Sequence, residues 1–327
     1  MIIRNEEKKR KEENLLFYTC TTNPAIDLFI ATNTMEPFIV NRTLKDEAQA
    51  NGKGVNISFV LKMLGIDNVA LGFLGGFTGN YIEEELQNAG VQTDFVKVDG
   101  QTRINVFTRV EDEDVEYKLV NQGPMISKKE KQLLLNKINK LNSEDTLFIS
   151  GSNPKGVEDS FLLQVAKLSQ ENGFRLILDS SSKVVLDCLQ YHPALIKPND
   201  EELAAWFDQK TLNHEELISY GKKLIEMGAQ RVLLSLGEEG ALYIEKDKLS
   251  FVNAAKGEVV NTACSGDTLL GTFMGMLLTG HETQEALRMA SAAGSSTAFS
   301  SGLTDFSDVE ELMKQIQVKT LSMEEGK

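Results

Sequence analysis

A turn of small residues, Asn261 to Thr268, runs directly into the apolar stretch Leu269 to Leu278. The first N–H groups of a helix have no partner inside it, and they lie at the positive end of its dipole. Such a turn is therefore typical of an anion site, above all for phosphate. Asp267 stands inside the turn, where a carboxylate would repel phosphate unless it had another task. Accepting a proton from an attacking hydroxyl group is such a task.

An ordinary capped helix is the alternative interpretation of this turn. Ser265 or Asp267 would then cap the first turn of the helix, and Gly266 would only permit a close approach. The turn alone does not decide between these interpretations, so the other polar loops of the chain have to be considered.

Two loops near the N-terminus also combine polar residues with turn formers. Asp27 follows a predicted strand at 15–21, and ligands of open α/β sheets collect at the carboxyl ends of strands. Asp27 is thus either a ligand contact or part of a plain turn. Lys53 lies between Gly52 and Gly54 at the start of a predicted helix, where a ligand can approach the backbone closely. The alternative is a solvated lysine on a first helical turn. The spacing is not that of a Walker A motif.

Strands alternate with helices from residue 146 to residue 235, which predicts a parallel sheet with helices on its faces. Four polar loops, at 151–154, 179–182, 197–202 and 235–240, fall at strand ends and form a binding rim. Residues 103–110 and 115–120 read as an exposed hairpin around an acidic turn. With residues 28–47 they predict a separate β flap, from which Arg103, Asn105, Lys118 and Asn121 can point into a cleft.

Composition limits the classes of partner. The chain has 327 residues, a net charge of −14, 41% hydrophobic residues and 25% charged residues, as expected for a soluble globular protein. The negative charge argues against nucleic acid and anionic membranes as partners. No apolar stretch is long enough to span a bilayer. Three distant cysteines and three scattered histidines favour reduced thiols in the cytoplasm and disfavour a zinc site or a Ser-His-Asp triad.

The predicted organisation is one α/β domain at 15–317. We interpret residues 1–14 as a mobile extension and residues 318–327 as a C-terminal tail. The flap would form a small β lid from about 28–50 and 98–123.

Eight short motifs together resemble those of the ribokinase-like carbohydrate kinases, in the branch of 1-phosphofructokinase and tagatose-6-phosphate kinase. The resemblance covers residues 17 to 316. Its motifs are NPAID at 23–27, GKGVN at 52–56, LGFLGGFTG at 71–79, TRINV at 102–106, SGSNPKG at 150–156, KPNDEEL at 197–203, SLGEEGA at 235–241 and SGD at 265–267. Each motif is weak alone, but their order and spacing are specific. The implied fold is a three-layer α/β structure with a central, mainly parallel sheet and a small β lid.

The resemblance implies transfer of the γ-phosphoryl group of ATP, with Mg²⁺, to a hydroxyl group of a ketohexose phosphate. Asp267 would be the catalytic base. The anion hole would be formed by Cys264, Ser265 and Gly266 with Asp267. The sugar would be held by Asp27, Gly52, Lys53 and Asn56, and its phosphate by Arg103 and Lys118. The nucleotide would be bound by Asn199, Ser235, Gly237 and Gly240. Glu202 would organise Mg²⁺ indirectly, through water.

The sequence departs from the family pattern at two positions. Cys264 replaces a glycine before Ser-Gly-Asp, and Asn51 replaces the first glycine of the usual GGKG motif. A side chain at either position narrows the space around the anion hole or the sugar. Cys264 is not expected to act as a nucleophile, because bound phosphate would disfavour its thiolate.

Fructose 1-phosphate is the first substrate that the motifs suggest, with fructose 1,6-bisphosphate as the product. Three alternatives remain open: a tagatose-6-phosphate kinase, a catalytically weak sugar-phosphate sensor, and a kinase of unphosphorylated sugars or nucleosides. A homodimer through the β lid and a monomer are both compatible with the sequence.

Overall fold

Short apolar segments form the strands of one large sheet in the computed structural model, which describes residues 16–322. These strands are β1 (Phe17–Thr21), β4 (Asn68–Leu74), β5 (Gln92–Thr93), β6 (Val96–Lys97), β9 (Thr146–Ser150), β10 (Arg175–Asp179), β11 (Leu195–Ile196), β12 (Val232–Ser235), β13 (Ala241–Glu245), β14 (Lys248–Val252) and β15 (Val318–Ser322). Their order is β15-β14-β13-β12-β11-β10-β9-β1-β4-β5, and β6 also pairs with β4. The pairings from β4 to β12 are parallel, and those from β12 to β15 are antiparallel.

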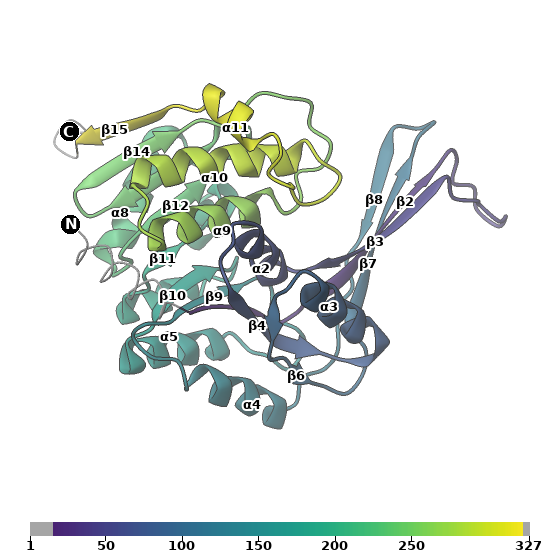
Figure 1. The fold of residues 1–327 in the computed structure, drawn as a ribbon, viewed down its shortest axis with the longest axis horizontal. Coiled ribbons are helices and arrows are strands. Elements are labelled where there is room, and N and C mark those ends of the chain that lie inside the picture. Colours follow the sequence, from purple (N-terminus) through teal and green to yellow (C-terminus); the bar gives the residue numbers. More distant parts are fainter. Residues whose placement is uncertain (1–15, 323–327) are drawn as a thin grey trace.

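Helices cover both faces of this sheet (Figure 1). The helices are α2 (Lys53–Met63), α3 (Gly76–Asn88), α4 (Lys128–Ile138), α5 (Ser160–Asn172), α6 (Val185–Cys188), α7 (Asp200–Trp206), α8 (His214–Glu226), α9 (Ser265–Leu278), α10 (Thr283–Ala298) and α11 (Val309–Leu312), with short 3₁₀ turns at Leu189–Tyr191, Gly237–Glu239 and Met313–Gln315. Apolar residues of α4 to α8 share one core, and those of α2, α9, α10 and α11 share another. Strand residues alternate between the cores: Leu147 and Ile149 face the first and Phe148 the second. The predicted three-layer α/β fold is confirmed.

Helix α9 is buried around most of its circumference between α2 and α10. Gly271 and Gly275 make this packing feasible, because a Cβ at Gly271 would lie 3.0 Å from Val60 Cγ1, and one at Gly275 would lie 2.9 Å from Ile66 Cδ1. An apolar helix therefore reaches the centre of the molecule with its N-terminus at the sheet edge. Within residues 16–322, no helix has the length and hydropathy needed to cross a membrane.

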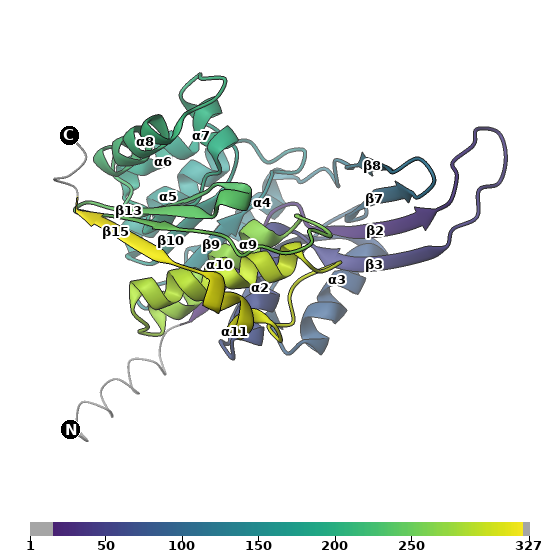
Figure 2. The same cartoon turned by 90° about the horizontal axis from the view of Figure 1, so that it is seen from above.

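A second sheet of four strands projects from the body (Figure 2). It contains β2 (Ala25–Thr32), β3 (Lys45–Asn51), β7 (Arg103–Val110) and β8 (Val115–Leu119), in the order β3-β2-β7-β8. Strands β7 and β8 form the hairpin that the sequence predicts. The parallel pairing of β2 with β7 places Ala25 opposite Arg103 and Asp27 opposite Asn105. We call this sheet the lid; its segments coincide with those from which the sequence predicts one.

The predictions for the two ends of the chain have different outcomes. The predicted extension at 1–14 lies outside the described residues. The predicted tail at 318–327 is wrong in its first half, because residues 318–322 form β15 and pair antiparallel with β14. The physical reason is that β14 would otherwise expose an unpaired edge, which a segment of suitable β-propensity covers. The motif analysis also omits α4, whose Ser127 and Glu130 form a capping box.

Candidate active site

The N-terminus of α9 opens onto a cleft of about 1260 Å³ between the body and the root of the lid. Cys264 is the N-cap residue with φ 66°, and no side chain caps the helix. This finding contradicts the capped-helix alternative. The Asp267 amide already donates to the Cys264 carbonyl at 3.0 Å, and the Ser265 amide lies 3.4 Å from the Thr262 carbonyl. The amides that remain for an anion are therefore those of Cys264 and Gly266.

The Ser265 hydroxyl adds a further donor to this helix start. Its oxygen is buried and has no hydrogen-bond partner within the described residues. A buried polar atom without a partner costs free energy unless a ligand or water satisfies it. The turn thus offers two amides and one hydroxyl to an anion, as a phosphoryl group would require.

Asp267 lines the cleft with only 6% of its surface exposed. Burial raises the pKa of Asp267 to about 6, and the nearby Asp179 carboxylate contributes in the same direction. Lys53, Asn56 and Lys197 act against this rise by favouring the charged form. A carboxyl group with such a pKa is largely ionised at neutral pH and still accepts a proton more readily than an exposed aspartate does.

Asp179 holds two lysines beside Asp267. Its carboxylate is fully buried, with Lys53 Nζ 2.8 Å from one oxygen and Lys197 Nζ 3.4 Å from the other. Burial opposes ionisation of Asp179, but the two lysines lower its pKa below the ordinary value. Burial also disfavours the charge on Lys53, yet Asp179, Asp267 and Glu202 together raise its pKa. Lys53 therefore stays charged at the cleft.

Lys197 lies directly at the anion hole. A Cβ built on Gly266 would be 3.4 Å from Lys197 Nζ, and both residues line the cleft. Lys197 and Asp179 begin two of the polar loops that the sequence predicts, but neither was predicted as a site residue. One signal was present: each is a charged residue directly after an apolar run, LILD and ALIK.

The root of the lid supplies the other wall of the cleft. Asn105 Nδ2 donates to Asp27 Oδ1 at 2.7 Å across the β2–β7 pairing. Burial raises the pKa of Asp27, which Asn105 and Arg103 partly offset. Arg103 donates to the carbonyls of Asn23 at 2.8 Å and Asn121 at 3.0 Å. Its Nε is buried and has no partner within the described residues, so one donor is left for a ligand.

Lys118 does not line this cleft, contrary to the prediction. Its side chain is 57% exposed and pairs with Glu116 at 3.0 Å. The reason is register: Lys118 stands opposite Phe107, four residues farther along β7 than Arg103. A side chain at this position therefore lies on the outer part of the lid, away from the root that borders the cleft.

Gly52 and the loop after β12 bring backbone close to the cleft. Gly52 has φ 135°, and a Cβ there would lie 2.8 Å from Thr21 Cγ2. Ser235 ends β12, and Gly237 and Gly240 follow with φ 55° and 111°. A Cβ on Gly240 would lie 2.0 Å from the Val252 carbonyl oxygen, so only glycine fits. All four residues line the cleft.

Asn199 and Glu202 form the capping box of α7. The Asn199 amide donates to Glu202 Oε2 at 3.0 Å, and the Glu202 amide donates to Asn199 Oδ1 at 2.7 Å. Both side chains also line the cleft. No group of three potential metal-ligating side chains occurs within residues 16–322. A metal ion here would therefore rely on phosphate oxygens and water, as Mg²⁺ commonly does.

Asn56, which the sequence predicts to contact the sugar, lies beside Asp267. It does not line the cleft but a second cavity of about 680 Å³ behind it. Its Nδ2 donates to Asp267 Oδ2 at 2.8 Å. Its amide group therefore contacts the carboxylate that the sequence identifies as the base.

The fold is of the ribokinase-like type. The chain belongs to the pfkB family of carbohydrate kinases, whose family model matches residues 21–310.

Among its relatives, a D-tagatose-1-phosphate kinase of Bacillus licheniformis is 53% identical over 94% of this chain and 100% of its own. A 1-phosphofructokinase of Borreliella burgdorferi is 36% identical over 94% of this chain and 99% of its own. The structure of Escherichia coli phosphofructokinase-2 with substrates and products has a TM-score of 0.86 and 27% identity, over 92% of this chain and 99% of that one.

Proposed function

We propose that this enzyme transfers the γ-phosphoryl group of ATP to the 6-hydroxyl group of a ketohexose 1-phosphate. The observation that carries the proposal is the position of Asp267. Its carboxylate lies in the cleft, beside two lysines and the open amides of α9. A hydroxyl group between Asp267 and the anion hole could lose its proton to this carboxylate while it attacks phosphorus. The new bond forms from the sugar oxygen to phosphorus, the bond to the β-phosphate oxygen breaks, and ADP leaves.

Charge neutralisation is assigned to the groups around the helix start. Phosphoryl transfer depends on alignment and electrostatic stabilisation more than on covalent chemistry. Lys197 Nζ lies beside Gly266, and Cys264 and Gly266 line the same cleft. These groups would stabilise the negative charge on the transferring phosphoryl group. Ser235, Gly237 and Gly240 would hold the nucleotide.

Mg²⁺ fits the site as an ion held by the ATP phosphates and water. When bound, it would neutralise phosphate charge. Glu202 supplies a carboxylate at the cleft, of which one oxygen caps α7 and the other remains for an ordered water. Glu202 would thus orient the hydration shell of the ion without direct contact.

The substrate phosphate is assigned to Arg103. The guanidinium group is fixed by two backbone carbonyls and keeps its buried Nε without a partner. A phosphate oxygen would satisfy that donor through a charge-assisted hydrogen bond. Asp27, Gly52 and Lys53 line the same cleft as Arg103 and Asp267 and would contact the sugar hydroxyl groups.

Fructose 1-phosphate and D-tagatose 1-phosphate are the two leading substrates. The motifs favour fructose 1-phosphate, and the identity of 53% favours its C4 epimer, the substrate named for the Bacillus licheniformis relative. Both carry the phosphate and the free 6-hydroxyl group at the same ends. A tagatose-6-phosphate kinase would need the phosphate at the opposite end of the sugar.

A panel of sugars tests this proposal. Turnover with ATP and Mg²⁺ is measured on fructose 1-phosphate, D-tagatose 1-phosphate, D-tagatose 6-phosphate, fructose 6-phosphate and unphosphorylated fructose. We expect kcat/KM to be highest for one of the two 1-phosphates. A preference for a 6-phosphate or for fructose itself would overturn the assignment, and absence of turnover on all five would favour a sugar-phosphate sensor.

We also propose a homodimer in which the outer lids of two copies pack together. Val115, Tyr117 and Leu119 form an exposed apolar row on one face of β8. Phe38 and Val40 extend exposed apolar surface at the tip of the β2–β3 connection. Exposed apolar rows such as that of β8 are typical of an interface. An enzyme that uses ATP and carries three free cysteines is expected in the cytoplasm.

A further inference from the structure

Asn51 and Cys264 separate the cleft from the second cavity. They are the two residues that line both spaces, and they come from opposite sides of the site. Asn51 ends the lid strand β3, whereas Cys264 is the N-cap of α9. Their side chains meet with Asn51 Nδ2 3.5 Å from Cys264 Sγ. Asn51 and Cys264, the two residues that depart from the family pattern, are therefore in contact with each other.

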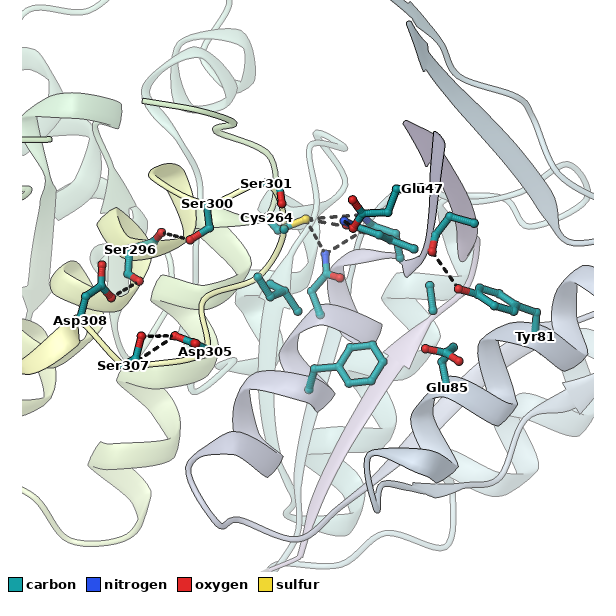
Figure 3. Close-up of a pocket in the computed structure, with 18 residues that line it drawn as sticks. Glu47, Tyr81, Glu85, Cys264, Ser296, Ser300, Ser301, Asp305, Ser307 and Asp308 are labelled. Carbon is teal, nitrogen blue, oxygen red and sulfur yellow. Dashed lines mark hydrogen bonds between the residues drawn. The ribbon is translucent and has the colours of Figure 1, made fainter. Parts of the chain in front are cut away.

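Both side chains converge on one amide nitrogen. Asn56 Nδ2 lies 2.9 Å from Asn51 Oδ1, 3.1 Å from Cys264 Sγ and 2.8 Å from Asp267 Oδ2. Figure 3 shows the Cys264 sulfur at the wall of the second cavity, with dashed lines to its neighbours. An amide NH₂ group has two hydrogens, so one is directed to the carboxylate and the other is shared between Asn51 and Cys264. The Asn56 donor is thereby fully committed.

The orientation of this network follows from the chemistry of its ends. An ionised carboxylate only accepts, so the nitrogen of Asn56 must face Asp267. The Gly52 amide donates to Asn51 Oδ1 at 2.6 Å, which directs that oxygen toward the helix start and leaves Asn51 Nδ2 for the sulfur. Each member therefore has one favourable orientation.

Cys264 keeps a side chain where the backbone favours glycine. Its φ of 66° lies in the left-handed region, which is unfavourable for a residue with a Cβ. Burial raises the pKa of the Cys264 thiol to about 12, so the sulfur is a neutral, weak acceptor. A strained residue that retains a contact at the base is best explained by a task for that contact.

We propose that Asn51 and Cys264 act as one pair of positioning residues that hold the Asn56 amide on the Asp267 carboxylate. The inference rests on the proposed function, because it concerns the general base of that reaction. The charged groups that face Asp267 are Asp179 from β10, Lys53 from α2 and Lys197 after β11, and the test leaves all three in place.

The test compares the pH dependence of kcat in Asn51→Ala, Cys264→Ala and the double variant. A hydrogen bond to the carboxylate favours its charged form, so a weaker bond moves the acidic limb of kcat to higher pH. We expect a shift of about 0.5 to 1 pH unit in the double variant. The loss of kcat should be about twofold to fivefold at pH 6 and small at pH 8. Cys264→Ala keeps the Cβ, so the backbone conformation is unchanged.

Three controls separate positioning from general damage. Gln49→Ala changes the same strand and the same cavity and should leave the pH profile unchanged, since Gln49 contacts Glu47 and not Asn56. Cys264→Ser retains an acceptor and should keep most of the wild-type profile. In an Asn56→Ala background, Asn51→Ala and Cys264→Ala should cause no further shift.

Two results would overturn the inference: an equal loss of kcat at every pH, or shifts that persist without Asn56. Titration of the Asp267 carboxyl carbon by NMR, assigned with Asp267→Asn, gives the same comparison without turnover. We expect a higher pKa of Asp267 in the double variant than in the wild type, and unchanged values would overturn the inference. Absence of turnover on every sugar phosphate, with the NMR shift present, would instead refute the proposed function alone.

Discussion

The two ends of the cleft hold their polar groups in different ways. At the helix start, Asp267 and Asp179 are 6% and 0% exposed, and each has a fixed partner. In the lid, Asp27 and Asn105 at the root are buried, whereas Lys118 farther out is 57% exposed. The difference agrees with the proposed function, in which the body carries out the chemistry, the root of the lid recognises the substrate, and the outer lid serves another purpose.

Replacement of the base should have the largest effect. Asp267→Asn keeps the shape of the side chain but accepts no proton, so kcat should fall about 10² to 10⁴-fold. The KM for ATP should change little, because the amides and lysines remain. Steady-state kinetics with a coupled ADP assay measures both constants.

Asp208→Asn is a suitable control for this variant, since Asp208 pairs with Lys183 on the surface and is distant from the cleft. The kcat and the KM for ATP of Asp208→Asn should equal those of the wild type. Turnover of Asp267→Asn within tenfold of the wild type would place the chemistry elsewhere.

The lid root and the outer lid are distinguished by two parallel variants. Arg103→Ala removes the buried guanidinium, and KM for the phosphosugar should rise about tenfold to a hundredfold, as expected when a charge-assisted hydrogen bond is lost. Lys118→Ala should leave KM within about twofold, because its side chain pairs with Glu116 in solvent. Equal effects of the two variants would refute the division of the lid.

The pH dependence of the base end follows from the raised pKa of Asp267. Asp267 accepts a proton only in its ionised form. The kcat should therefore fall about tenfold for each pH unit below about pH 6. The same shift affects stability. The folded state favours protonated Asp267, so this stabilising contribution is present at low pH and lost as pH rises through about 6.

Urea unfolding of the wild type and Asp267→Asn at pH 5 and pH 8 tests the stability part. The wild type should lose stability relative to the variant between these values. An unchanged difference in the free energy of unfolding would show that the pKa of Asp267 is not raised.

The smallest effect on catalysis is expected at the outer lid. Tyr117→Glu or Leu119→Glu places a charge in the apolar row of β8 and should convert a dimer to a monomer in sedimentation experiments. The kcat should change by less than about threefold, since neither residue lines the cleft. A monomeric wild type at micromolar concentration would contradict the dimer.

Local patterns in the sequence predicted the fold and most of the cleft lining. The alternation of strands and helices defined the parallel sheet, and small-residue turns marked the strand ends that bind ligands. These features are determined by residues that are close together in the sequence. The turn before α9, which contains Asp267, is an example. The edge strand β15 was missed because the strand with which it pairs, β14, lies 66 residues or more earlier in the chain.

The contacts between distant segments could not be predicted in this way. Asp179 meets Lys53 and Lys197 because β10 lies beside β11 and faces α2, an arrangement that the sequence does not state. Lys118 was misplaced because its distance from the root depends on the register of β7 and β8. The contact of Asn56 with Asp267 joins two helix starts that are 211 residues apart.

A crystal structure of the full chain with a non-hydrolysable ATP analogue and fructose 1-phosphate or D-tagatose 1-phosphate tests the central claim most directly. The account predicts an Asp267 carboxylate oxygen within about 2.6 to 3.2 Å of the sugar 6-hydroxyl group, with the γ-phosphoryl group at the N-terminus of α9. A 6-hydroxyl group that lies against another side chain, with Asp267 remote from it, would contradict the account.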